Sequence, residues 1–243
     1  MNNTLIIIPS RMSAKRLPGK PLLKINGKTL ISLVLKKAED CKVGKAIVAT
    51  EDKKIQKEVK SNGGKAILTS KKHKSGTDRI WEAFQKLKDN KIKYIINLQG
   101  DEPLIDVKDV RNLNKIVKKN KFKIATLAVK IKNKKILNNK NIVKVATKKK
   151  LNYLHPQKAL NFYRASKINY KYCYQHIGIY QYSVSALKTF FHLKRTVNEK
   201  KNSLEQLRAI DNKIPINVIL AKKNVVGIDT KEDYIELKKN FKY

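Results

Sequence analysis

The sequence predicts an α/β fold, a three-layer sandwich in which helices cover both faces of a mostly parallel β-sheet. Short apolar runs alternate with longer amphipathic stretches through the first half of the chain. Strands separated by helical patterns of about 10–15 residues are typical of βαβ units, whose strands run parallel. Right-handed crossovers then build an open sheet that binds its ligands at the carboxyl ends of the strands.

The expected elements of the first half follow from local patterns. Residues 4–8 form a strand, which Pro9 ends. Residues 29–41 form a helix, because Leu30, Leu33 and Val34 recur with the spacing of one helical face. A Gly63-Gly64 pair ends the helix that follows the second strand. The other expected strands are 45–50, 65–69 and 94–98, and the other expected helices are 51–62 and 75–89.

The pattern loosens beyond residue 120, where asparagine and lysine become frequent. We expect a loop between residues 131 and 142. The expected strands are 125–131, 142–146, 176–182 and 216–221, and the expected helices are 183–193, 203–211 and 231–240. No internal repeat and no linker is visible, so the sequence predicts a single domain spanning residues 1–243.

Charge is the strongest compositional feature, with 56 Lys and Arg against 19 Asp and Glu and a formal net charge of +37. Such a field attracts anions, including nucleic acid, anionic membranes and small polyanionic substrates. A genome-wide lysine bias would give the same pattern, because the lysines are spread along the whole chain. The sequence lacks a nucleic-acid recognition motif, so nucleic-acid binding is the disfavoured alternative.

The compartment follows from the cysteines and the apolar runs. Cys41 and Cys173 are isolated, which fits reduced thiols. The first apolar run stops at Pro9, too early for a signal peptide, and no run approaches the ~18 residues of a spanning helix. We therefore expect a cytoplasmic protein without membrane insertion.

The first motif is the loop PSRMSAKRLPGKPL, residues 9–22. Its basic residues surround Pro18-Gly19, where glycine lets the backbone approach a ligand, and they can neutralise a triphosphate. At this lysine content four bases in one loop are also compatible with an ordinary surface. The basic residues are Arg11, Lys15, Arg16 and Lys20.

Two acidic motifs offer a metal site. In NLQGDEPLI, Asp101 lies in a Gly/Pro turn directly after an expected strand, and in VVGIDTKED, Asp229 follows a short apolar run. Magnesium is held by one or two carboxylates together with substrate phosphates, so these aspartates could share an ion. The alternatives are a polar surface turn for Asp101 and a helix N-cap, with Glu232 or Asp233 nearby, for Asp229.

Two further stretches have a structural and a functional interpretation. In HKSGTDRI, Ser75 or Thr77 can cap the following helix, while Arg79 can project toward the sheet edge. In SLEQLRAI, Glu205 and Gln206 fit the polar face of a helix.

Taken in order, these stretches and HIGIY resemble the 3-deoxy-manno-octulosonate cytidylyltransferases, the CMP-Kdo synthetases, over about residues 4–237. The resemblance implies a Rossmann-like nucleotide-diphospho-sugar transferase fold with a mixed, mostly parallel sheet. It implies a homodimer that converts CTP and Kdo to CMP-Kdo and pyrophosphate with Mg2+, for lipopolysaccharide biosynthesis. The nucleotide-binding part would be about residues 1–120, and the sugar-binding and dimerisation part about 121–243.

The resemblance also assigns roles to individual residues. Its catalytic residues are Lys20, Asp101 and Asp229, and the two aspartates hold the metal. Its CTP-binding residues are Arg11, Arg16, Lys20, Arg79 and Gln99. Its sugar-binding residues are Gln99, Arg164, His176, Tyr180, Glu205 and Gln206.

The departures from the family pattern concentrate in the sugar-binding part. The segment after Arg164 is short, Asn202 replaces an acid, and Lys231 replaces a proline. In the first loop Ala14 and Lys15 stand where the family has a small hydroxyl residue. The same reaction on 8-amino-Kdo or another ulosonic acid is therefore the alternative substrate hypothesis.

Overall fold

The structure is a computed structural model that describes residues 3–13, 16–164, 170–223 and 227–240. It contains two compact units, one formed by Met1–Arg111 with Val225–Tyr243 and the other by Asn112–Asn224. No helix in these described ranges has the length and apolar character that crossing a membrane requires.

The first unit is built on a parallel sheet with strand order β5-β4-β1-β6. Its central strand β1 pairs in parallel with β4 on one side and β6 on the other. Nearly every residue of β1 is buried, as in strands covered on both faces. The bounds are β1 Thr4–Ser10, β4 Lys45–Thr50, β5 Ala66–Leu68 and β6 Tyr94–Asn97, and a small hairpin joins β2 Lys24–Ile25 to β3 Lys28–Thr29.

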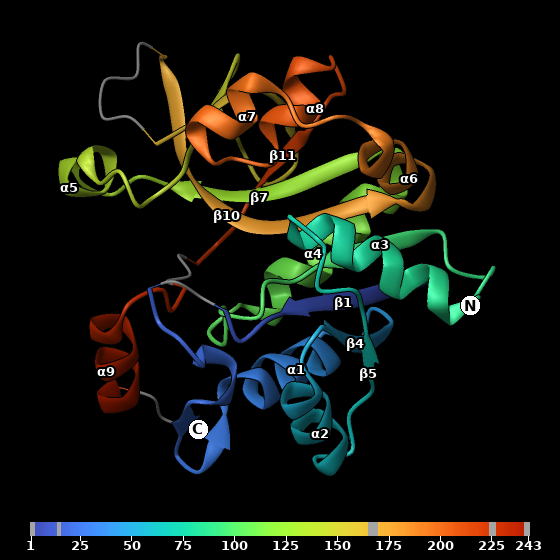
Figure 1. Ribbon diagram of the computed structural model, residues 1–243. Helices are drawn as coiled ribbons and strands as arrows, with labels where there is room; N and C mark the ends of the chain where they lie inside the picture. The colour runs from blue at the N-terminus through green and yellow to red at the C-terminus, as the bar shows by residue number, and fades with distance from the viewer. Residues whose placement is uncertain (1–2, 14–15, 165–169, 224–226, 241–243) are drawn as a thin grey trace. The chain divides into compact units, whose positions relative to one another are not determined.

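Helices cover this sheet as expected of βαβ units. Figure 1 shows α1 and α2 on one face of the strands and α3 on the other. The four expected helices of this unit are confirmed, α1, α2 and α3 with ends shifted by a residue or two and α9 with the expected bounds. The bounds are η1 Lys20–Leu22, α1 Leu30–Asp40, α2 Lys53–Ser61, α3 Gly76–Leu87, α4 Val107–Asn120 and α9 Lys231–Asn240. Helix α4, on which the division between the units falls, was not predicted from the sequence.

The second unit has mainly antiparallel pairing. Strand β10 pairs with β7 and with β8, β8 pairs with β9, and β11 joins β9 to β7, so the strands close into a ring. Only the β11–β7 pair is parallel among the pairings described in this unit. The bounds are β7 Ile124–Lys130, β8 Lys144–Thr147, β9 Gln157–Tyr163, β10 Tyr172–Ser183 and β11 Asn217–Leu220.

Short helices complete the second unit, and here the sequence expectations need correction. The expected loop between 131 and 142 contains α5, which Asn133 caps through its side chain. The expected helix 203–211 is confined to α8, because Ser203 adopts φ 51° and ends α7. Strand β9 and helix α7 were not predicted. The bounds are α5 Lys134–Asn138, α6 Val184–His192, α7 Val197–Asn202 and α8 Leu207–Asp211.

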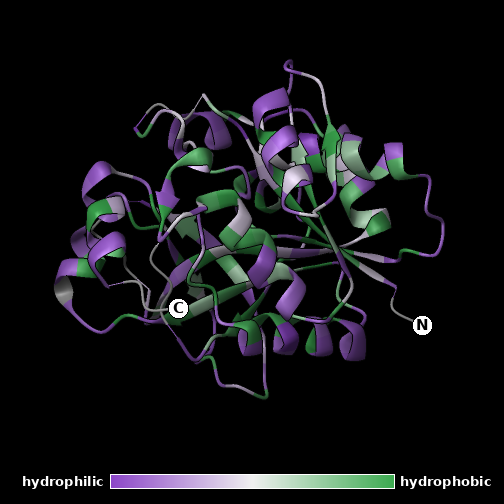
Figure 2. Ribbon diagram, turned by 90° about the horizontal axis from the view of Figure 1, so that it is seen from below, coloured by the Kyte–Doolittle hydropathy of each residue, from purple (hydrophilic) through white to green (hydrophobic). Residues whose placement is uncertain are grey.

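The α/β class and the mixed sheet are confirmed. In Figure 2 the helical ribbons alternate between hydrophobic and hydrophilic residues, as helices with one buried face do. Two basic side chains, Arg208 and Lys144, are among the largest fully buried ones. Buried charges require partners, so these two residues organise polar interactions inside the second unit.

Candidate active site

The loop after β1 delivers Lys20 to the carboxyl edge of the parallel sheet. Gly19 has φ +73°, a left-handed conformation that glycine adopts without strain, and its N–H donates to the Met12 carbonyl at 3.2 Å. Lys20 follows as the first residue of η1. Ala14 and Lys15 of this loop lie outside the described residues.

The QGDEP turn lies directly against the end of β1. A Cβ on Gly100 would be 3.0 Å from the Pro9 carbonyl oxygen, so the turn reaches this position because residue 100 is glycine. The Glu102 N–H donates to the Gln99 carbonyl at 3.3 Å and closes the turn. Asp101 is thereby held at the sheet edge rather than on a projecting surface loop.

The segment before α9 lies against the same turn. Ile228 donates its N–H to the Asp101 carbonyl at 2.9 Å, and its side chain belongs to a buried apolar cluster with Leu17 and Leu30. Thr230 and Asp233 cap α9 reciprocally: Asp233 N–H donates to Thr230 Oγ1 at 3.2 Å, and Asp233 Oδ2 accepts from Thr230 N–H at 2.8 Å. Thr230 is thus the cap, and the Asp229 carboxylate is available for other contacts.

Lys20, Asp101 and Asp229 meet at one point. The Lys20 Nζ donates to Asp101 Oδ2 and to the Ile228 carbonyl, both at 2.7 Å, and lies 3.4 Å from Asp229 Oδ1. Arg16 Nη2 lies 2.9 Å from Asp229 Oδ2. Two carboxylates and a carbonyl oxygen therefore converge on one cationic nitrogen, and the Lys20 side chain is only 12% exposed.

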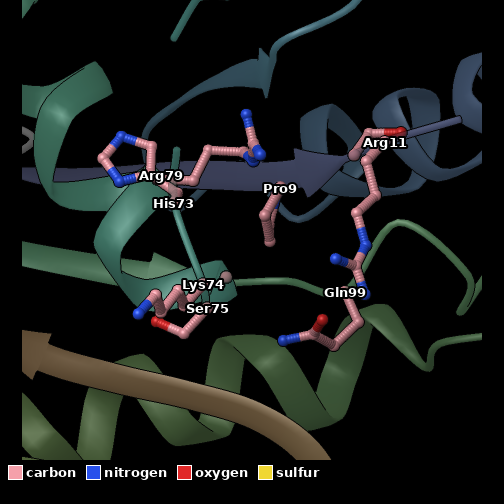
Figure 3. A pocket seen from close by; sticks show the side chains of 9 residues that line it. Pro9, Arg11, His73, Lys74, Ser75, Arg79 and Gln99 are labelled. Carbon is pink, nitrogen blue, oxygen red and sulfur yellow. The ribbon is translucent and has the colours of Figure 1, made fainter. Parts of the chain in front are cut away.

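A pocket of about 170 Å³ opens beside the end of β1 within the same unit. Figure 3 shows Arg11 and Gln99 on one side of it and His73, Lys74 and Ser75 on the other. Gln99 donates its side-chain amide to Asn97 Oδ1 at 3.0 Å. The lining is rich in donors and basic groups, which suits an anionic, hydrogen-bonding ligand; the lining residues are Pro9, Ser10, Arg11, His73, Lys74, Ser75, Gly76, Arg79 and Gln99.

Arg79 lines this pocket from α3, which Ser75 caps by accepting from the Asp78 N–H at 3.1 Å. Its side chain is almost completely buried and forms an ion pair with Glu51 and a 2.5 Å hydrogen bond to Thr69 Oγ1. Glu51 and Thr69 were not predicted from the sequence. Both residues directly follow strands of the parallel sheet, which is the signal that could have identified them.

Glu82 fixes the loop that forms one wall of the pocket. Its Oε2 accepts the Ser70 N–H at 2.8 Å and pairs with His73 Nε2, while Oε1 lies 2.6 Å from Lys86 Nζ. Burial alone would raise the pKa of Glu82, but the hydrogen bonds from Lys86, Ser70 and His73 outweigh it and hold the pKa at about 2. Glu82 is therefore a carboxylate at neutral pH.

In the second unit, His176 and Tyr180 lie next to each other on β10, with ring centroids 5.4 Å apart. The His176 Nε2 lies 2.9 Å from Thr126 Oγ1, and its ring also packs edge-on against Phe162. Burial lowers the pKa of His176 to about 3, so its imidazole is neutral at physiological pH. Burial likewise raises the pKa of Tyr180 well above its ordinary value.

Glu205 and Gln206 precede α8, next to a buried ion pair. Arg208 donates to both carboxylate oxygens of Glu199, at 2.9 and 2.7 Å, and its guanidinium lies 4.6 Å from the centre of the Phe190 ring. Glu205 Oε1 is 3.9 Å from Arg208 Nη2. The Glu199–Arg208 pair, which was not predicted from the sequence, therefore lies beside Glu205, one of the residues expected to bind the sugar.

Arg164 follows β9 and donates its guanidinium to the Asn141 carbonyl at 3.2 Å. The carbonyl of Arg164 accepts in turn from Lys144 Nζ at 3.4 Å, and the same ammonium donates to the Asn139 carbonyl at 2.9 Å. Lys144 is fully buried, and this burial lowers its pKa. The segment that follows Arg164, residues 165–169, lies outside the described residues.

Comparison with known proteins defines the class first. The family model described as cytidylyltransferase matches residues 5–218, most of the chain, and so covers both units.

Two relatives and one solved structure narrow this class to a single activity. The 3-deoxy-manno-octulosonate cytidylyltransferase of Thermodesulfovibrio yellowstonii is 41% identical over 242 residues, covering 95% of this chain and 94% of the relative. That of Fusobacterium nucleatum is 40% identical over 228 residues, covering 93% and 92%. The solved structure of CMP:2-keto-3-deoxy-manno-octonic acid synthetase complexed with CTP is 35% identical, covers 97% of each chain and gives a TM-score of 0.87. The chain belongs to the family of 3-deoxy-manno-octulosonate cytidylyltransferases.

Proposed function

We propose that this chain transfers CMP from CTP to the anomeric hydroxyl of Kdo, 3-deoxy-manno-octulosonate, and releases pyrophosphate, for lipopolysaccharide biosynthesis. The observation that carries the proposal is the meeting of Lys20, Asp101 and Asp229 beside a pocket lined by Arg11, Arg79 and Gln99. Relatives at 40% and 41% identity over nearly the whole chain have this name.

The first unit supplies the groups that a triphosphate needs. Arg11, Arg16 and Lys20 come from one loop and present positive charge at the carboxyl edge of the sheet. The anomeric oxygen of the sugar attacks the α-phosphorus, the bond to the β-phosphate oxygen breaks, pyrophosphate leaves with the electron pair, and the hydroxyl proton passes to solvent. Such a transfer is accelerated mainly by positioning and by charge neutralisation, and it needs no covalent intermediate with the protein.

We propose Asp101 and Asp229 as ligands of Mg2+. Their carboxylates and the Ile228 carbonyl already surround one positive charge, and hard oxygen donors are those that Mg2+ prefers. The described residues contain no group of three or more His, Cys, Asp or Glu side chains suited to a metal, so substrate phosphates would complete the coordination. When bound, the ion would neutralise phosphate charge and make the sugar hydroxyl more acidic.

The second unit supplies the residues proposed for the acid sugar. Arg164 is the candidate for bidentate pairing with the sugar carboxylate, because a guanidinium matches the geometry of two carboxylate oxygens. His176, Tyr180, Glu205 and Gln206 are the candidates for its hydroxyl groups. Asn202, which replaces an acid of the family pattern, donates to Asn198 Oδ1 at 2.7 Å within α7.

We also propose a cytoplasmic homodimer. Cys41 and Cys173 are free thiols, as in reducing compartments. Several large apolar side chains of the second unit are exposed, including Leu154 at 82% and Val197 at 80%, and exposed apolar groups often mark association surfaces. Sedimentation equilibrium of the full chain tests the dimer, and a concentration-independent monomer mass would refute it.

The deciding experiment measures pyrophosphate release from CTP with Mg2+ and a panel of acid sugars, namely Kdo, 8-amino-Kdo and sialic acid. We expect release with Kdo and its loss in Asp101→Asn. Release with 8-amino-Kdo alone would keep the reaction and change the substrate. No release with any sugar, from protein with a cooperative thermal transition, would refute the proposed function.

A further inference from the structure

Strand β10 contains a bulge opposite Thr126. Ile177 is paired with Leu127 and Tyr180 with Thr126, so Gly178 and Ile179 have no partner on β7. Bulges bend a strand and re-aim its side chains, and they leave backbone groups of the ladder to be satisfied in other ways. Here the bulge lies between His176 and Tyr180 along the strand, and the centroids of their two rings are 5.4 Å apart.

Thr126 is fully buried, and its hydroxyl lies within hydrogen-bond distance of the backbone carbonyl groups of this bulge. Its Oγ1 lies 2.7 Å from the Ile179 carbonyl, 3.3 Å from the Ile177 carbonyl and 2.9 Å from His176 Nε2. A hydroxyl has one proton to donate, and carbonyl oxygens can only accept. The proton of Thr126 therefore points to the Ile179 carbonyl, the nearest acceptor.

This assignment determines the proton on the histidine. With its own proton committed to Ile179, Thr126 Oγ1 presents a lone pair to His176 Nε2, so the imidazole nitrogen must be the donor. The opposite arrangement would place an oxygen lone pair against two carbonyl oxygens in a buried site, which is costly. His176 Nδ1 makes no hydrogen bond with any residue that the structure describes.

We propose that Thr126 is a positioning residue that holds His176 as the neutral Nε2–H tautomer, which leaves Nδ1 as an acceptor for a hydroxyl group of the sugar. The inference rests on the proposed function, because it deepens the role of the sugar-binding histidine. A lone pair on Nδ1 attracts a hydroxyl donor and repels a carboxylate. His176 then binds a hydroxyl group of the sugar in preference to its carboxylate, and an arginine binds the carboxylate instead.

The low pKa of His176 agrees with this assignment, since burial keeps the ring neutral. Thr126→Val preserves the shape of the side chain but removes the hydroxyl, and Thr126→Ser retains the hydroxyl with a smaller side chain. The two variants therefore separate the hydrogen bonds from the packing.

The first test is 15N NMR of histidine-labelled full-length protein at neutral pH, with His176 assigned through His176→Gln. We expect the Nε2–H tautomer in wild type and in Thr126→Ser, and a mixed or reversed tautomer in Thr126→Val. A protonated ring, an Nδ1–H tautomer in wild type, or an unchanged tautomer in Thr126→Val would overturn the proposal. The wild-type and serine spectra remain decisive if the valine variant does not fold.

The second test measures steady-state kinetics of the same proteins. We expect Thr126→Val to lower kcat/KM for the sugar by about three- to tenfold, as for the loss of a neutral hydrogen bond, with recovery in Thr126→Ser. The KM for CTP should change less than twofold (about the experimental error), and an equal rise in both KM values would contradict a sugar-specific role. Wild-type protein that releases no pyrophosphate refutes the proposed function, whereas the NMR result tests Thr126 independently of activity.

Discussion

Lys20 donates a 2.7 Å hydrogen bond from its ammonium to Asp101, although 81 positions separate the two residues in the chain. The contact joins the loop after β1 to the turn after β6, so it depends on the parallel alignment of both strands. It also means that a residue proposed to bind phosphate and a residue proposed to bind metal form an ion pair with each other.

Asp101→Asn should abolish most of the activity without weakening CTP binding in the absence of metal. The amide keeps the size of the side chain but removes one of the two negative charges near Lys20. We expect kcat to fall by about 10²–10³, the usual loss on removing one electrostatic group from such a site. Calorimetric CTP titration with and without Mg2+ checks the binding, and Asp40→Asn, in an exposed pair with Lys36, is the matched control. A kcat of Asp101→Asn within threefold of wild type (roughly the scatter of the control) would refute the proposed catalytic role of Asp101.

Arg79→Ala should impair CTP binding and stability together. The variant removes a pocket-lining group and leaves Glu51 without its ion-pair partner, which should cost about 1–3 kcal/mol. The double variant with Glu51→Gln should recover stability but not the KM for CTP. Chemical denaturation and initial rates at varied CTP separate the two effects, and an unchanged KM in Arg79→Ala would place this arginine in a purely structural role.

Glu82 should stabilise the first unit in a pH-dependent manner. Its folded pKa of about 2 lies below the ordinary value of 4.5, so the folded state favours the carboxylate. The stabilisation is complete above pH 4.5 and is lost as the pH falls toward 2. Urea unfolding of wild type and Glu82→Gln should therefore differ most near neutral pH and converge in acid. A difference that grows on acidification would contradict the assigned direction.

The Glu199–Arg208 pair should contribute more than any exposed pair. Both side chains are 2% exposed, so Glu199→Gln leaves the buried Arg208 guanidinium without the opposite charge of Glu199. The substitution should lower the free energy of unfolding by about 3–5 kcal/mol. Disruption of the exposed Lys36–Asp40 pair should cost less than about 0.5 kcal/mol. Denaturant titration compares the two, and similar losses would show that burial does not decide the energetics here.

The strands of the first unit were predicted because their pattern is local and repetitive. Each strand of the parallel sheet is an apolar run followed by a helix, and proposed site residues such as Arg11 and Gln99 lie just beyond the strand ends. The sequence did not decide which residue caps the N-terminus of α9, and this choice determines whether the Asp229 carboxylate can belong to the site. Sequence allowed either Asp229 or Thr230 to cap, and only the reciprocal bonds of Thr230 with Asp233 show that the Asp229 carboxylate is directed to Lys20.

The second unit was less predictable because its contacts join distant strands. Strand β9 reads as a polar, interrupted segment, and it is a strand because β8 and β11 pair with it. Lys144 looked like one lysine among many, and its complete burial depends on carbonyls at positions 139 and 164. Thr126 carried no signal at all, since its role arises from a bulge in another strand.

The return of the chain to the first unit has a consequence for biosynthesis. Lys20 and Asp101 leave the ribosome early, but Ile228 and Asp229 follow only after the entire second unit has been made. A nascent chain that has reached residue 223 can form the parallel sheet, yet it lacks the carbonyl and the carboxylate that complete the cluster. Because domains fold as they emerge during synthesis, we expect the sheet to form first and the proposed active site to be completed last.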